Sequence, residues 1–382
     1  MADVSSSSGR IGSLDGLRGI AALWVLIGHA MLLTGWHLPL IGDPDLGVDL
    51  FIMLSGFLMV FHYQLRENKK PWTDVTTWSS FWTRRFFRIA PLYYVMLAVA
   101  VALGPIVFQS RMTIDHFLGV TPQLPERYLD ASLKNIMLHL SFLFGLSPAH
   151  AFRTPLPDWS ISLEMQFYAA FPFLMLISRR LGWLKGTIGF VLAGVAFASA
   201  IRAAGINFPM PAFLPLKLHV FAAGMLLAGA LNASRGRALA HFALALAFVV
   251  IPIGGGMTLM REIVRLLLVI AFFALIFHAH LPRPFAGLMN RLSDVMGNRF
   301  CHELGELSFG VYLIHLLIMQ PAIAYLIHAY GHDISDFRRF LLSVAITIPI
   351  TYALSAIGHR FIEMQGQKIG RTLTRRRAPA LP

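Results

Sequence analysis

The chain has 382 residues, of which 56% are hydrophobic and only 13% are charged, and its mean hydropathy is +0.64. An ordinary soluble domain carries about 25% charged residues, so this composition excludes a soluble enzyme and predicts an integral protein of the lipid bilayer. The formal net charge of +13 would suit a nucleic-acid-binding protein, but Lys and Arg of membrane proteins collect in cytoplasmic loops, so we expect no nucleic-acid partner.

Apolar runs near the length of about 20 residues that crosses a bilayer recur along the whole chain. They predict ten spans, at residues 17–35, 47–65, 89–109, 160–178, 186–203, 214–232, 238–256, 264–280, 307–328 and 340–361. Segment 133–147 is apolar for only about a dozen residues, a length typical of a re-entrant or interfacial helix. The predicted fold class is therefore all-α, with about ten transmembrane helices plus one re-entrant or interfacial helix.

The basic residues support this topology. With ten spans, the basic runs RENKK, RRFFR, SRRLGWLKG, SRGR, the 281–305 loop and RTLTRRR all fall on one side, which the positive-inside rule assigns to the cytoplasm. Arg338 and Arg339 are the exception. We expect a flexible cytoplasmic N-terminus at 1–12, a membrane domain at 13–364 and a basic cytoplasmic tail at 365–382. The sequence shows no internal repeat, which argues against the two inverted halves of a transporter.

The first span carries a stripe of polar residues. Residues 14–30 read LDGLRGIAALWVLIGHA. On a helix, Arg18 and His29 share one face because eleven residues make three turns plus only about 20°. Asp15 lies one turn before Arg18, and the distance from Arg18 to His29 is about 16 Å at 1.5 Å per residue. The stripe therefore points toward a partner helix or a cavity.

Other spans also contain ionisable groups, each of which costs about 2.5 kcal/mol or more at the bilayer centre unless it has a partner or faces water. They are Asp49, the arginines of RRFFR (Arg84, Arg85 and Arg88), Glu164, His219 and His315. Some have a structural explanation: Asp49 as a helix-capping carboxylate, the arginines as positive-inside anchors, and His219 as a hydrogen-bonded histidine of the bundle. Packing alone does not explain Glu164 or the pair of Arg18 and His29.

Together these groups suit acid–base chemistry on an anionic substrate, with an imidazole to take a proton, carboxylates to orient it and arginines to bind the anion. The chain has a single cysteine, Cys301, and no HExxH, GxSxG, Walker A or GxGxxG motif, so we expect no metal, serine-hydrolase, ATPase or dinucleotide site. Group transfer from a phosphorylated donor to a hydroxyl fits the remaining pattern. A transporter of an anionic glycolipid or acyl donor is the alternative.

Six blocks of the sequence resemble acyltransferase family 3 of membrane-bound acyltransferases. In chain order they are LDGLRGIAALWVLIGH, GVDLFIMLSGFL, RRFFRIAPLYY, WSISLEMQFY, LSFGVYLIH and HRFIE. Arg18 and His29 match the arginine-to-histidine signature of the family, and Arg85 and Arg88 match its RxxR element. The resemblance implies a bacterial inner-membrane O-acyltransferase that moves an acyl group, usually acetyl, from cytoplasmic acyl-CoA to a hydroxyl of a cell-surface glycan or glycolipid. A small-molecule acceptor such as an antibiotic is the alternative.

The resemblance and the polar residues together predict the site. His29 is the expected general base, or the carrier of a covalent acyl group, with Glu164 and Asp15 as catalytic partners. Arg18, Arg84, Arg85 and Arg88 are the expected donor-binding residues; Asp49, Tyr312 and His315 are supporting residues; and Asp158 and Trp159 are acceptor-binding residues. Two departures from the family pattern stand out. Met364 and Gln365 follow Ile362 and Glu363 where many members have Ile-Glu-x-Pro, and we expect no appended SGNH-type domain.

Overall fold

The computed structural model describes residues 11–67, 71–256, 258–278 and 282–376, and these residues form helices with no strand among them. The helices are α1 (Gly12–Thr34), α2 (Pro44–Arg66), α3 (Val75–Leu118), α4 (Glu126–Leu129), α5 (Leu133–Leu140), η1 (Leu143–Leu146), α6 (Trp159–Leu181), α7 (Trp183–Ala203), α8 (Leu214–Ala230), α9 (Arg235–Val249), α10 (Leu259–Ile276), α11 (Arg283–Met296), α12 (Arg299–Tyr330), α13 (Asp336–Gly358), η3 (His359–Glu363) and α14 (Met364–Arg376). The all-α membrane fold class is confirmed. Residues 1–10 of the expected N-terminus and 377–382 of the expected tail lie outside the described residues.

Seven helical segments in the described part of the chain are long and apolar enough to cross a membrane. They contain α1, α2, α3, α6, α7, α12 and α13. Three other helices stand where the sequence predicts the remaining spans. Of these, α8 and α9 have 17 and 15 residues, and α10 has 18 residues but carries Arg261, Glu262 and Arg265. The count of ten spans therefore stays a prediction.

Three segments outside the predicted spans also contain helices. Residues 133–147 contain the eight-residue α5 and the four-residue η1, and neither reaches the length of about 20 residues that crosses a bilayer. The 281–305 loop contains α11, an amphipathic helix without a buried residue, which the sequence analysis did not predict. Helix α14 covers residues 365–376 of the expected tail and begins at Met364, the last residue of the expected membrane domain.

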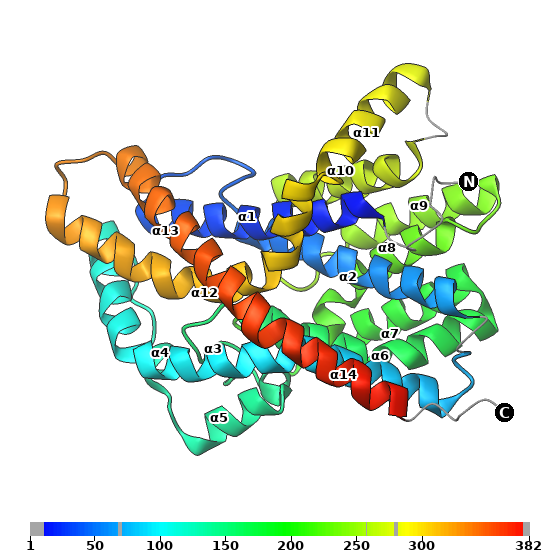
Figure 1. Ribbon diagram of the computed structural model, residues 1–382, viewed down its shortest axis with the longest axis horizontal. Coiled ribbons are helices and arrows are strands. Elements are labelled where there is room, and N and C mark those ends of the chain that lie inside the picture. The colour runs from blue at the N-terminus through cyan, green and yellow to red at the C-terminus, as the bar shows by residue number, and fades with distance from the viewer. Residues whose placement is uncertain (1–10, 68–70, 257, 279–281, 377–382) are drawn as a thin grey trace.

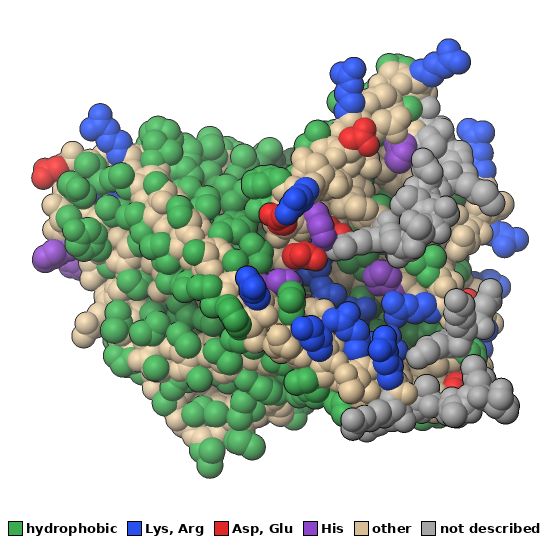
Figure 2. Space-filling view, viewed as in Figure 1, with side chains coloured by type: hydrophobic (Ala, Val, Ile, Leu, Met, Phe, Trp, Pro, Cys, Tyr) green, Lys and Arg blue, Asp and Glu red, His purple; other side chains and the backbone are tan. Residues whose placement is uncertain are grey.

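The bundle has two ends that differ in the helix termini they carry (Figure 1). Helix α1 begins and α14 ends at one end, whereas the turn between α12 and α13 lies at the other. We call the first the basic end, because most of the Lys and Arg side chains visible in Figure 2 gather there, beside a broad apolar surface. The second is called the opposite end. Helix α1 packs along α12, and α2 packs along α8, so these four helices form the centre of the bundle.

The crossing of α2 and α8 is a backbone-to-backbone contact. A Cβ atom on Gly56 would lie 2.1 Å from the carbonyl oxygen of Phe221, and one on Gly224 would lie 1.9 Å from that of Met53. Small residues allow membrane helices to approach this closely. As a result, every residue of α8 from Lys217 to Ala230 is buried.

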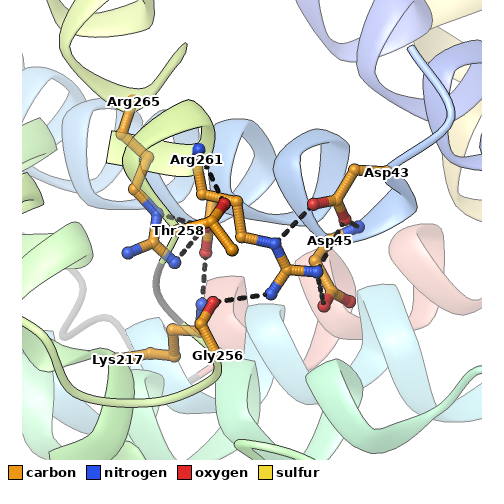
Figure 3. A network of polar contacts seen from close by, with 8 residues as sticks. Asp43, Asp45, Lys217, Gly256, Thr258, Arg261 and Arg265 are labelled. Atoms are coloured by element: carbon orange, nitrogen blue, oxygen red, sulfur yellow. Dashed lines mark hydrogen bonds and ion pairs between the residues drawn. The ribbon is translucent and has the colours of Figure 1, made fainter. Parts of the chain in front are cut away.

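A buried ionic cluster ties α2 to α8 and α10 (Figure 3). Nζ of Lys217 lies 2.6 Å from one carboxylate oxygen of Asp49, and Nε of Arg265 lies 2.7 Å from the other. All three residues are at most 3% exposed. Nearby, Arg261 pairs with Asp43 and with Asp45. The six side chains carry three positive and three negative charges and so balance one another.

The interpretation of Asp49 as a helix cap is wrong. The N-cap of α2 is Asp43, whose side chain accepts a hydrogen bond from the backbone N–H of Asp45. Asp49 lies more than a turn further along the helix, where it faces the two cations of α8 and α10. Its role in the fold is therefore to neutralise charge.

We predict that Asp49→Asn lowers the free energy of unfolding by about 3–5 kcal/mol, because it leaves Lys217 and Arg265 buried without their counter-charge. Thermal unfolding of the purified protein in detergent measures this loss. Glu303→Gln is the matched control, since Glu303 and Arg299 form an exposed pair and exposed pairs contribute little. Equal melting temperatures for the two variants would contradict the prediction.

Candidate active site

Three cavities follow one another from the opposite end to the basic end. The vestibule, of about 1030 Å³, is lined by His29, Trp159 and Tyr312 among others. The central cavity, of about 80 Å³, is lined by Arg18, Arg85, Arg88, Glu164 and Tyr312 among others. The basic pocket, of about 300 Å³, is lined by Arg66, Arg84, Arg85, Arg88 and Arg371 among others.

Adjacent cavities share wall residues. Tyr312 and Val48 line both the vestibule and the central cavity. Arg85 and Arg88 line both the central cavity and the basic pocket. The three cavities therefore adjoin in series, and the polar stripe of α1 follows them, with Arg18 in the central cavity and His29 in the vestibule.

His29 and His315 form a pair between α1 and α12. Nδ1 of His29 lies 3.2 Å from Nε2 of His315 and 2.9 Å from the carbonyl oxygen of Val25. Nδ1 of His315 lies 2.8 Å from the carbonyl oxygen of Tyr312 and 3.1 Å from that of Val311. His315 is fully buried, whereas His29 is partly exposed.

These contacts determine which nitrogen carries the proton in the neutral pair. Nδ1 of His315 faces only carbonyl oxygens, so it is the donor, and Nε2 of His315 is left as an acceptor. Nδ1 of His29 faces that acceptor and a carbonyl oxygen, so it too carries a proton. The unprotonated nitrogen of His29 is therefore Nε2, the nitrogen that a general base uses.

Glu164 lies in the central cavity with three arginines. Its Oε1 accepts hydrogen bonds from Ser55, at 3.0 Å, and from Tyr168. The guanidinium of Arg85 lies over the rings of Tyr168 and Phe81, at 5.5 and 5.7 Å from their centroids. No hydrogen bond joins Glu164 to His29 among the described residues, and the position beside His29 belongs to His315. The sequence analysis did not find Ser55 or Tyr168.

Tyr312 stands in the wall between the central cavity and the vestibule. Its hydroxyl donates to the carbonyl oxygen of Pro157 and lies 2.7 Å from Oγ of Ser160. Because the single phenolic proton goes to Pro157, Ser160 is the donor in the second contact. These bonds fix Tyr312 against the start of α6.

The structure does not bring Asp15, Asp49 or Asp158 into these cavities. Asp15 lies 3.7 Å from Nδ1 of His302 on α12. Asp158 is fully buried, accepts a hydrogen bond of 2.9 Å from Tyr93, and lies 3.7 Å from Nε2 of His139. Its neighbour Trp159 does line the vestibule.

The sequence analysis was wrong about His219 and did not find Arg127. His219 is 1% exposed, and neither of its ring nitrogens has a hydrogen-bond partner among the described residues, so the prediction that it is hydrogen-bonded within the bundle is wrong. Arg127, from the short helix α4, lines the vestibule with its guanidinium 3.5 Å from the ring centroid of Phe152. The sequence analysis did not find Arg127, because a single charge between two spans carries no pattern. Within the described ranges, no three His, Cys, Asp or Glu side chains are arranged to hold a metal ion.

Comparison with known proteins gives the family. The family described as an acyltransferase domain matches residues 11–356. Acyltransferase MdmB of Streptomyces mycarofaciens is 28% identical over 363 residues, which cover 85% of this chain and 80% of that protein.

Other relatives match over shorter regions. Peptidoglycan O-acetyltransferase OatA of Listeria monocytogenes is 29% identical over 45% of this chain and 25% of that protein. A putative O-acetyltransferase of Staphylococcus aureus is 30% identical over 50% of this chain and 28% of that protein. No solved structure matches the chain.

The family match covers most of the residues that form the bundle and its cavities, and the relatives named here are acyltransferases. The chain therefore belongs to acyltransferase family 3 and is a membrane acyltransferase.

Proposed function

We propose that the protein transfers an acyl group, most simply acetyl, from acyl-CoA at the basic end to a hydroxyl of a cell-surface glycan or glycolipid in the vestibule. In this proposal the basic end faces the cytoplasm and the vestibule faces outward across the bacterial inner membrane. Both described ends of the chain then lie on the cytoplasmic side. The observation that carries the proposal is the series of three cavities with shared walls.

The three cavities suit the three parts of the donor. Arginines bind phosphates through charge-assisted, forked hydrogen bonds, and the basic pocket offers five of them, Arg66, Arg84, Arg85, Arg88 and Arg371. The narrow central cavity suits the thin pantetheine arm. Arg18 and His29 lie about 16 Å apart along α1, a length comparable with the extended arm, so the thioester reaches the region of Tyr312 and His29.

The chemistry follows from the histidine pair. The acceptor hydroxyl oxygen forms a bond to the acyl carbon, and the carbon–sulfur bond of the thioester breaks. Nε2 of His29 takes the hydroxyl proton and passes it to the departing sulfur, so CoA leaves as the thiol. Nε2 of His315 accepts a hydrogen bond from Nδ1–H of His29 and so holds the ring in the tautomer that the reaction needs.

The vestibule is the proposed site of the acceptor. A vestibule of about 1030 Å³ has room for more than one sugar unit, and a relative is named for O-acetylation of peptidoglycan. Mass spectrometry of surface glycans from a deletion strain and its parent tests the proposal. Glycans without a mass difference of acyl size would overturn the glycan acceptor in favour of a small molecule.

We predict that His29→Ala lowers acyl transfer by about 10²–10⁴-fold, the usual loss when a general base is removed, while binding of acetyl-CoA stays close to wild type. Restoration of the glycan modification in the deletion strain measures transfer, and equilibrium binding of labelled acetyl-CoA measures the donor site. His116→Ala, at an exposed position on α3, is the control.

Near-normal transfer by His29→Ala would overturn the assignment of the base. A labelled acyl group trapped on wild-type protein, and absent from His29→Ala, would replace direct transfer with a covalent acyl-histidine. These two results are distinguishable because the first concerns the rate and the second concerns the fate of the label.

His315 gives a separate test. We predict that His315→Ala lowers the rate of transfer without weakening donor binding, because Nδ1 of His29 loses its ring partner. His315→Gln keeps an acceptor oxygen at the end of the side chain and should recover part of the rate. Equal rates for the two variants would mean that the pair contributes only packing.

We also predict that Arg88→Lys weakens acetyl-CoA binding although the charge is kept, because Lys presents a point charge where Arg presents a planar fork. Isothermal titration with CoA measures the effect, with Arg88→Ala as the more severe variant. Unchanged affinity in both would reduce Arg88 to a topology anchor.

A further inference from the structure

Helix α14 packs closely on α3 although it lies beyond residues 11–356, which the family matches. A Cβ atom on Gly366 would lie 2.6 Å from the carbonyl oxygen of Phe87, and one on Gly370 would lie 2.9 Å from its Cβ. The two glycines are four residues apart and so share one face of the helix. Their lack of side chains lets α14 approach the part of α3 that carries Arg84, Arg85 and Arg88.

This close packing brings the polar face of α14 to the basic pocket. Gln367 and Arg371 line the pocket. Nε of Arg371 donates to the carbonyl oxygen of Gln367, at 3.3 Å, and no carboxylate pairs with Arg371 among the described residues. The C-terminal helix therefore adds a cation to the pocket rather than neutralising it.

The wall of the basic pocket has the composition of a nucleotide-phosphate site. Its described lining includes five arginines and His62 but no Asp or Glu. Glu164 in the central cavity offsets part of the charge of Arg85 and Arg88. Arg66, Arg84 and Arg371 have no acidic residue beside them in the described lining, and like charges repel one another, so the pocket is stabilised by a polyanion.

The linings of the two cavities give the order of the arginines along the path to His29. Arg85 and Arg88 line the central cavity as well and so are nearest the path to His29. Arg66, Arg84 and Arg371 line the basic pocket but not the central cavity. When the reacting group of a ligand lies near His29, the opposite end of that ligand therefore lies near Arg371.

We propose that α14 completes the donor site, with Arg371, assisted by Arg66 and Arg84, binding the phosphate at the far end of the donor, the 3′-phosphate of the CoA nucleotide. This inference rests on the proposed function, in which the donor is an acyl-CoA. It assigns a role in donor specificity to α14, a helix that lies outside residues 11–356, which the family matches.

The experiment compares CoA with 3′-dephospho-CoA, which differ in this phosphate alone. Isothermal titration of the full-length protein in nanodiscs gives the affinity of each probe for wild type, Arg371→Gln and Arg375→Gln. Arg375 is exposed on the same helix one turn on and does not line the pocket, so it is the matched control. We expect Arg371→Gln to bind CoA about tenfold more weakly, the loss of roughly one charge-assisted hydrogen bond.

The same variant should bind 3′-dephospho-CoA as wild type does, and Arg375→Gln should match wild type for both probes. Gly370→Leu tests the packing separately: it should push α14 off α3 and remove the preference for CoA while helical content by circular dichroism is kept. Equal CoA affinity in wild type and Arg371→Gln, or equal losses for both probes, would overturn the assignment. Wild-type protein that binds neither probe would instead overturn the acyl-CoA donor itself.

Discussion

The cost of an ionised group inside a bilayer governs this structure, because each buried charge must find a counter-charge or a cavity. Asp49 meets the first condition, with Lys217 and Arg265 as its partners. Arg18 and Arg88 meet the second, since both line the central cavity. The ion pairs of Asp49 thus lie apart from the cavities, whereas Arg18 and Arg88 face them. Asp43, Asp45 and Arg261 do both, since they pair with one another and also line the vestibule.

The proposed reaction depends on the two histidines. His315 is fully buried, and its Nδ1–H donates to backbone carbonyl oxygens. It therefore presents only its acceptor nitrogen, Nε2, to His29. That arrangement uses no carboxylate, although a carboxylate is the usual partner of a catalytic histidine. A neutral partner avoids adding another charge to the membrane interior. Glu164 is left to the arginines and to Tyr168 in the central cavity, where its charge offsets part of theirs.

The sequence predicted what local hydropathy determines and missed what tertiary contact determines. Long apolar runs identified α1, α2 and α12, since about 20 such residues are a strong signal. The 14-residue α11 is too short for that signal. Asp49 was misread as a cap because its partners lie 168 and 216 residues away in the chain. The contact of His29 with His315, 286 residues apart, is equally invisible to spacing, although both histidines were named as candidates.

The sizes of the cavities bear on the choice between transfer and transport. A transporter of an anionic glycolipid passes its whole cargo through the narrowest point, whereas a transferase passes only the arm that carries the acyl group. Here the central cavity of about 80 Å³ separates a vestibule of about 1030 Å³ from a basic pocket of about 300 Å³. The walls at the narrow point are held in place, since Tyr312 is bonded to Pro157 and Ser160. In the proposed reaction, a donor held by the arginines of the basic pocket and an acceptor in the vestibule meet through the central cavity, so the arm that carries the acyl group is the part that has to pass it.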